Sequence, residues 1–209
     1  MPFSTIGMDI FAHGFWTGAV YKAAKRETGR PLHTAFAAFW GVFPDLLAFT
    51  PAFLYLFYES VFGGEGFASL KPHIDLESAT VAHQVPLYNL SDSLYNVSHS
   101  LVIFAVVFII IWMLRRRPVW ELGGWLIHIL IDIPTHSYKF FPTPFLWPIS
   151  DLKLNGISWG LPWFMLLNYG NLAALYLVLS RRGLTRPFRT VLAALALVLV
   201  SASIASRFG

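Results

Sequence analysis

Six stretches of this chain are apolar for about the length that crosses a bilayer, and this repetition constrains the fold more than any other feature. A membrane-spanning helix needs about 20 predominantly apolar residues. The chain is 56% hydrophobic and 12% charged, with a mean hydropathy of +0.59, which is unusual for a soluble domain of 209 residues. The stretches cover residues 3–21, 33–58, 95–114, 119–138, 159–179 and 188–204. We therefore expect an all-α, polytopic transmembrane bundle of about five to six membrane helices, with residues 1–209 forming a single integral membrane domain.

The lysines and arginines predict how this bundle is oriented. Most of the 15 basic residues follow the first, third and fifth stretches: Lys22, Lys25, Arg26, Arg30, Arg115, Arg116, Arg117, Arg181, Arg182, Arg186 and Arg189. Basic residues favour the cytoplasmic side, so the N-terminus is expected outside, together with two longer loops over residues 61–90 and 139–158. Because the basic clusters flank apolar stretches, they indicate membrane topology and no nucleic-acid partner.

Ionisable side chains recur within the apolar stretches, at His13, Asp45, His99, His128 and Asp132. Such residues are costly inside a bilayer unless they have a partner or a function. With the expected orientation, all five fall in the outer half of the membrane. The chain therefore predicts a buried polar site that faces the extracytoplasmic side.

The spacing of these residues suits a metal ion. His128 and Asp132 are one helical turn apart on one face, so an imidazole nitrogen and a carboxylate oxygen can reach the same ion. Asp45 follows Pro44, and His99 lies between two serines whose hydroxyls could orient it. The chain has no cysteine, so a divalent metal would be held by nitrogen and oxygen ligands.

Two further predictions concern the end of the fourth stretch. Pro134 leaves the carbonyl of Leu130 without its helical partner and is expected to kink the helix. His136 would lie about 12 Å along a continuous helix from His128, too far to share one ion with it. His136 is therefore expected to serve a second metal, the substrate or the rim of the site.

These residues also resemble those of a known family. The histidine near the N-terminus, the Pro44-Asp45 pair, the Ser98-His99-Ser100 element and the pair His128 and Asp132 followed by Thr135 are similar to the membrane-bound metal-dependent hydrolase family. That family, also described as inner-membrane hydrolases, is distantly similar to zinc-dependent phospholipase C. The resemblance covers about residues 10–148. Leu47 and Leu94 stand where the family commonly has further ligands.

The resemblance implies a hydrolase of the prokaryotic inner (plasma) membrane, with zinc as the metal and a lipid or another phosphoester or acyl compound as the substrate. His13, Asp45, His99, His128 and Asp132 would be the metal ligands. Asp45 or His136 could act as general base, because a bound metal activates water for hydrolysis. The aromatic segment 140–148 could anchor the protein at the interface beside anionic lipid headgroups.

Other functions remain open at the level of sequence. His128 and Asp132 could form a structural pair between helices, as could the amides Asn168 and Asn171. The ionisable residues could belong to an ion or proton transporter, although they gather on one side and no internal repeat is visible. The histidines could bind haem, although carboxylates suit a harder ion better. A non-catalytic subunit of a membrane complex is the remaining alternative.

Overall fold

The computed structural model describes residues 10–62, 86–138, 141–181 and 186–205. Within these residues it has seven α-helices, one short 3-10 helix and no strand, which confirms the all-α class. Most of the predicted outer loop 61–90, the first residues of stretch 3–21, and Lys139 and Phe140 lie outside the described residues. The elements are α1 (Ile10–Thr28), α2 (Thr34–Phe62), α4 (Pro86–Ser98), α5 (Leu101–Arg115), η1 (Trp120–Leu122), α6 (Gly123–Thr135), α7 (Pro162–Ser180) and α8 (Pro187–Ala205).

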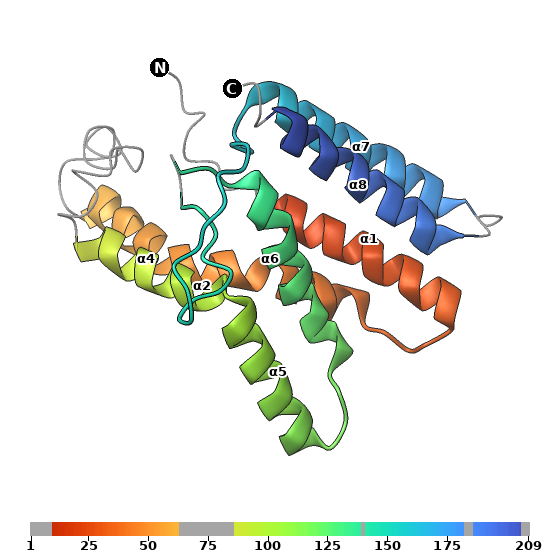
Figure 1. The fold of residues 1–209 in the computed structure, drawn as a ribbon, viewed down its shortest axis with the longest axis horizontal. Helices are drawn as coiled ribbons and strands as arrows, with labels where there is room; N and C mark the ends of the chain where they lie inside the picture. Colours follow the sequence, from red (N-terminus) through yellow and green to blue (C-terminus); the bar gives the residue numbers. More distant parts are fainter. Residues whose placement is uncertain (1–9, 63–85, 139–140, 182–185, 206–209) are drawn as a thin grey trace.

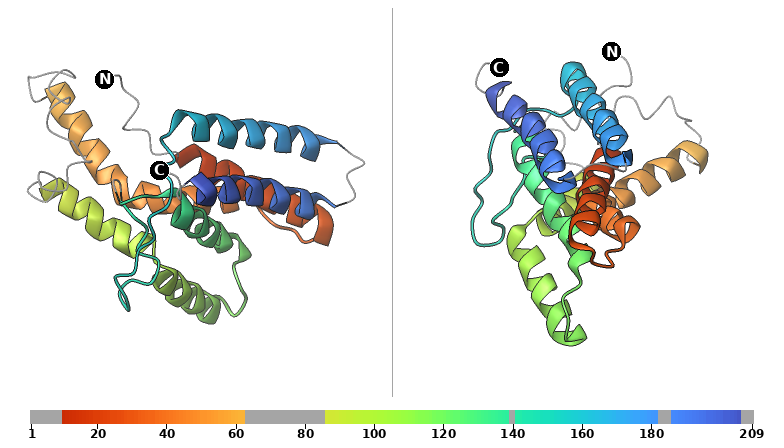
Figure 2. Two further views of the ribbon diagram at one scale, coloured as in Figure 1. Left: turned by 45° about the horizontal axis from the view of Figure 1, so that its top comes forward. Right: turned by 90° about the vertical axis from the view of Figure 1, so that its right-hand side faces the viewer.

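Helix α1 lies at the centre of the arrangement and packs against α2, α6, α7 and α8. The hairpin of α7 and α8 lies along one side of α1, while α2 extends away beside α4 (Figure 1). Helix α5 leaves the end of α4 at an angle and descends past α6 (Figure 2). A core of apolar side chains, including Trp16, Phe164 and Leu172, joins α1 to the α7–α8 hairpin.

Fewer helices could cross a membrane than the five to six that the sequence predicts. Two helical segments, Thr34–Tyr55 and Pro162–Ser180, are long and apolar enough. The pair Asn89–Ser98 and Leu101–Arg115 passes only as one broken span bent by 59°. This count of two or three among the described residues is compatible with a membrane protein.

The remaining helices are too short or too charged to cross a membrane as single spans. Helix α1 carries Lys25 and Arg26 in its last turn. Helix α6 has 13 residues, so it rises only about 20 Å against a hydrocarbon thickness of about 30 Å. In α8 the apolar part is limited to Pro187–Ser201.

Two interruptions of the helices fall next to the predicted site. The stretch beginning at residue 95 breaks at Ser98–Leu101, where the Ser100 hydroxyl caps α5 by accepting from Val102 N and Ile103 N at 3.1 and 3.2 Å. The sequence predicts a kinked helix that continues past Pro134, and this prediction is wrong. Helix α6 ends at Thr135, and His136 has extended backbone. Pro134 has no N–H for the carbonyl of Leu130, which explains the early end.

The segment after α6 folds back onto the bundle and is not an exposed outer loop throughout. Gly156 N donates to His136 O at 2.7 Å, and Leu101 N donates to Phe145 O at 3.0 Å. Phe141 and Thr143 are buried. Part of the aromatic segment therefore covers the end of α6, where the sequence had suggested only an interfacial anchor.

Gly41 allows α1, α2 and α6 to approach closely. A Cβ atom on Gly41 would overlap the side chain of Thr17 on α1 and meet His13 O at 3.0 Å. A Cβ atom on Gly124 of α6 would overlap the carbonyl of Ala37 on α2. The absence of a side chain at Gly41 and Gly124 thus lets three helices that carry predicted site residues pack closely together.

Candidate metal centre

The five predicted ligands come from separate elements and converge on Asp132. His13 lies on α1, Asp45 on α2, and His99 at the junction of α4 and α5, while His128 and Asp132 lie on α6. All five side chains are buried, and His99, His128 and Asp132 have no exposed surface. Two residues in one helix therefore meet partners that lie 29 to 119 positions away in the chain.

Four of these residues form a compact group of metal-ligating atoms. Asp45, His99, His128 and Asp132 each offer one atom, and the four atoms lie within 4.8 Å of one another. Asp132 Oδ2 lies 3.1 Å from His99 Nε2 and 3.0 Å from His128 Nε2. Asp45 Oδ1 lies 3.5 and 3.7 Å from the same two nitrogens. Four ligands placed tetrahedrally at about 2.1 Å from a metal would be about 3.4 Å apart, close to these distances.

The hydrogen bonds of the two histidines decide which nitrogen faces the group. His128 Nδ1 lies 2.7 Å from Gly41 O, and His99 Nδ1 lies 3.2 Å from Tyr95 O. A carbonyl oxygen can only accept, so these contacts favour a hydrogen on each Nδ1; the Ser98 hydroxyl, 2.9 Å from His99 Nδ1, fits this tautomer because it can accept there and donate to Tyr95 O. In a neutral imidazole the other nitrogen then has the lone pair. Both Nε2 atoms therefore point a lone pair toward the two carboxylates.

The two buried carboxylates of this arrangement would be stabilised by a positive charge between them. The Nε2 atoms of His99 and His128 lie 2.9 Å apart, beside two buried carboxylates. The oxygens of Asp132 lie 3.0 to 3.5 Å from nitrogens of four histidines, and they accept no well-aligned hydrogen bond from the described residues. Buried carboxylates are strongly unfavourable unless a nearby positive charge balances them. The cluster could hold a divalent metal ion, which would satisfy all four atoms together.

His13 and His136 contact the other oxygen of Asp132. His13 Nε2 lies 3.1 Å and His136 Nε2 lies 3.5 Å from Asp132 Oδ1. The His13 ring also packs against His128 with centroids 4.0 Å apart. His136 reaches Asp132 because α6 ends at Thr135, so the distance expected from a continuous helix does not apply. These two histidines lie outside the group of four, and a ligand role for His13 stays a prediction.

A second layer of contacts around the cluster was missed by the sequence reasoning. Tyr95 stacks on His99 at 3.7 Å between centroids, and its hydroxyl lies 3.2 Å from His136 Nδ1. The same Nδ1 donates to Phe141 O at 3.0 Å, and Phe141 has a positive φ of 39°. Backbone strain of this kind is retained where surrounding structure enforces it. Tyr95 lies four residues before His99, which is the one signal that could have identified it.

The two serines that flank His99 make different contacts. Ser98 Oγ lies 2.9 Å from His99 Nδ1, as expected for a residue that orients the ring. The backbone oxygen of Ser98 also accepts from Trp125 Nε1 at 2.5 Å. Ser100 makes no such contact with His99; it caps α5 and donates to Trp147 O. Its function is thus to fix the bend between α4 and α5.

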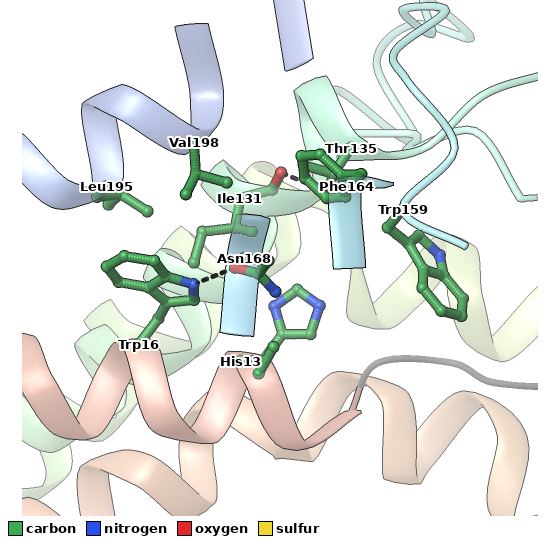
Figure 3. Close-up of a pocket in the computed structure, with 10 residues that line it drawn as sticks. His13, Trp16, Ile131, Thr135, Trp159, Phe164, Asn168, Leu195 and Val198 are labelled. Carbon is green, nitrogen blue, oxygen red and sulfur yellow. Dashed lines mark hydrogen bonds between the residues drawn. The ribbon is translucent and has the colours of Figure 1, made fainter. Parts of the chain in front are cut away.

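A small pocket lies beside His13, between α1, α6, α7 and α8 (Figure 3). Its walls are mainly apolar, with Trp16, Ile131 and Phe164 among them, and its polar side chains include Thr135. Asn168 reaches into it and accepts from Trp16 Nε1 at 2.8 Å. We refer to this space as the site pocket, because His13 connects it to Asp132.

Comparisons with known proteins add no assignment. A scan against protein-family models and searches of curated proteins and of solved structures found no match for this chain. The cluster itself is therefore the feature of this protein that points to a function.

Proposed function

We propose that the protein is a membrane-embedded metal-dependent hydrolase that acts on a lipid or another phosphoester or acyl substrate at the outer leaflet. The observation that carries this proposal is the convergence of two Nε2 lone pairs and two carboxylates, all buried and within 4.8 Å of one another. A set of four nitrogen and oxygen ligands is one that zinc commonly binds. The resemblance to membrane-bound metal-dependent hydrolases points in the same direction.

His136, Asp45 and His13 would have different roles in hydrolysis. When bound, a divalent metal activates a water molecule near neutral pH and polarises a phosphoryl or carbonyl oxygen. His136 is the better candidate for general base, because its Nδ1 donates to Phe141 O and its Nε2 is left to accept a proton. Asp45 belongs to the group of four and is better suited to hold the metal. His13 would orient Asp132 through its 3.1 Å contact.

Metal content is the first test of this proposal. We expect stoichiometric divalent metal in the detergent-purified protein and its loss in His128→Ala and Asp132→Ala. His33 is exposed and does not belong to the group of four, so His33→Ala is a matched control that should keep the metal. Wild-type protein purified without added chelator and free of divalent metal would overturn the proposal.

Hydrolysis is the second test, and it separates metal binding from catalysis. We expect metal-dependent cleavage of a phosphodiester or carboxyl ester probe by the wild type. His136→Ala should retain the metal and lose most of this activity, by about 100-fold or more, the usual contribution of a general base. Equal activity of His136→Ala and wild type would remove the role proposed for His136.

The basic residues support an N-terminus outside and a site that faces the extracytoplasmic side of a prokaryotic inner (plasma) membrane. Because the chain has no cysteine, single cysteines can report orientation directly. Asp151 and Arg116 are both exposed. A membrane-impermeant maleimide should label Asp151→Cys in intact cells and Arg116→Cys only after permeabilisation. The reverse pattern would place the site on the cytoplasmic side.

The geometry gives less support to the alternatives. Axial haem ligands lie on opposite faces of one iron, whereas His99 Nε2 and His128 Nε2 are 2.9 Å apart with carboxylates beside them. A transporter would need polar residues across the membrane, whereas those described here gather around one carboxylate. Ion flux in liposomes that disappears with Asp45→Asn would favour transport. Stable co-purification with partner proteins, without metal, would favour a non-catalytic subunit.

A further inference from the structure

A large cavity lies where α1, α6 and α8 contact one another, and none of the four clustered ligands lines it. We refer to it as the α6–α8 groove; its volume is about 470 Å³, within the roughly 300–1,000 Å³ of small-molecule sites. Its mainly apolar walls include Leu126, Leu130, Leu192 and Leu199. Leu130 and Leu192 are 48% and 47% exposed, so a hydrocarbon chain could enter the groove from a surrounding bilayer.

The groove begins on the side of the basic residues and has about the length of one lipid leaflet. At this end it is lined by Thr28, the last residue of α1, and by Gly123 and Phe188 at the starts of α6 and α8. It follows α6 as far as Ile131, about 12 Å on, and α8 as far as Leu199, about 17 Å on. Half of a hydrocarbon core about 30 Å thick is about 15 Å, the depth that the acyl chains of one leaflet fill.

The end of the groove on the basic side carries a positive charge. Among the described residues that line the groove, Arg30 is the one that is charged. Gly29 has a φ of 67° and turns the chain at the end of α1, and the Arg30 guanidinium lies 5.9 Å from the centre of the Trp120 ring. Trp120 is 50% exposed, as is typical of a tryptophan at a membrane–water interface. Arg30 makes no ion pair within the described part of the chain, so its charge is available to an anion.

The acidic side chains at this end contact backbone amides. Glu121 Oε1 accepts from His33 N at 3.1 Å, and Glu27 Oε2 accepts from Phe188 N at 3.1 Å. The described residues on this side of the bundle include more basic than acidic side chains, so the local potential favours an anion.

We propose that the α6–α8 groove binds one acyl chain of an anionic phospholipid from the leaflet on the basic side, with the lipid phosphate at Arg30. A planar guanidinium can donate two parallel hydrogen bonds to a phosphate. An acyl chain gains no hydrophobic free energy on moving from other lipid tails into the groove, so selectivity comes from this contact and from the shape of the groove. The lipid site is separate from the metal centre and does not rest on the proposed hydrolase function.

Photo-crosslinking in nanodiscs tests where the lipid lies. The probe is phosphatidylglycerol with a diazirine near the methyl end of one acyl chain, in bilayers of phosphatidylethanolamine and phosphatidylglycerol. We expect its label on Ile131 and Leu199, enriched over Ile109 and Ile110, the exposed apolar control surface of α5. A probe with the diazirine beside the ester should instead label Trp120. Absence of enrichment, or the reverse order of the two labels, would overturn the proposal.

A change of headgroup tests the contact with Arg30. The same probe built on phosphatidylethanolamine should label the groove about fivefold less, the effect of one basic residue on an anionic lipid. Arg30→Gln should remove this preference, whereas Arg117→Gln, at an exposed position on the same side that does not line the groove, should keep it. Equal labelling of the wild type by the two probes, or equal effects of the two substitutions, would contradict an anionic headgroup at Arg30.

A matched pair of substitutions on α8 tests the shape of the groove. Leu192→Trp should fill the opening and remove most of the label, while Leu197→Trp, 56% exposed and outside the groove lining, should leave it unchanged. The proposal fails if both substitutions have the same effect. A groove that stays unlabelled in a wild-type dimer would be assigned to a second copy of this chain, which also excludes the lipid.

Metal content measured on the same samples separates this proposal from the hydrolase. Arg30→Gln and Leu192→Trp change none of the four clustered ligands, so both should keep the metal. Wild-type protein that shows the lipid enrichment but holds no divalent metal would sustain the lipid site and overturn the hydrolase. Wild-type protein with metal but without enrichment would overturn the lipid site and leave the hydrolase standing.

Discussion

Beside Asp132 the α4–α5 pair is broken and α6 ends early, whereas α7 and α8 run without a break for 19 residues each. The α4–α5 pair bends by 59° at His99, and α6 stops one residue before His136. Helix α7 instead buries one stripe, with Phe164, Asn168, Leu172, Leu175 and Leu179. Within a membrane, irregular backbone is tolerated only where other protein groups or water satisfy it.

The two regions obtain their stability in different ways. The α7–α8 hairpin packs by apolar contact, and its polar bonds act between helices, as in Asn171 Nδ2 to Ala194 O at 2.7 Å. The region around Asp132 depends on a network in which each polar group orients the next. Substitutions around Asp132 should therefore lower the stability of the protein strongly and in a way that depends on bound metal. Substitutions in the α7–α8 hairpin should change the stability little and independently of metal.

The largest effect is expected for Asp132→Asn, which keeps the shape of the side chain and removes its charge. The free energy of unfolding should fall by about 3–5 kcal/mol, as for a buried pair that loses one partner, and bound metal should be lost. Thermal unfolding in detergent and elemental analysis would measure both. Asp151→Asn, at an exposed position, is the control. Unchanged metal content in Asp132→Asn would contradict the central role of this carboxylate.

Gly41→Ala should have the next largest effect. The added methyl group would overlap Thr17 and shift the carbonyl that accepts from His128 Nδ1, at a cost of about 1–3 kcal/mol. The matched control is Gly170→Ala on α7, where a Cβ atom meets nothing within 4 Å. That change should raise stability by about 0.5–1 kcal/mol through helix propensity. If both substitutions stabilise the protein, the close approach at Gly41 is not needed.

Tyr95→Phe should destabilise the protein by about 1 kcal/mol, because it removes the hydroxyl that contacts His136 and keeps the ring that stacks on His99. Metal content should not change. Tyr58→Phe, at an exposed position, should alter thermal stability by less than about 0.5 kcal/mol. Loss of metal from Tyr95→Phe would mean that the hydroxyl supports the cluster itself.

The smallest effect is expected for Asn171→Ala in the α7–α8 hairpin, at about 0.6 kcal/mol with no loss of metal. Combined with Asp132→Asn, its effect on the thermal midpoint should be additive, because the two sites share no partner. A clear deviation from additivity would show that the two regions are energetically coupled and do not obtain their stability independently.

Much of the helix pattern could be predicted from the sequence, because apolar periodicity and basic flanks are local features. The six predicted stretches each overlap a helix of the structure. The number of membrane-crossing helices could not be predicted, since it depends on the end of α6 at Thr135 and on how the charged end of α1 is placed. The position of His136 was missed for the same reason, because a chain that leaves its helix no longer follows a rise of about 1.5 Å per residue.

The sequence alone determined which residues are candidates, because histidines and aspartates in apolar stretches need a partner wherever they lie. Only the tertiary structure decided that Nε2 of His99 and of His128 face the same carboxylates. That choice is made by the carbonyls of Tyr95 and Gly41, and Gly41 lies 87 positions from His128. Backbone carbonyls are present at every position of a chain, so nothing in the residue types reveals which of them orients an imidazole.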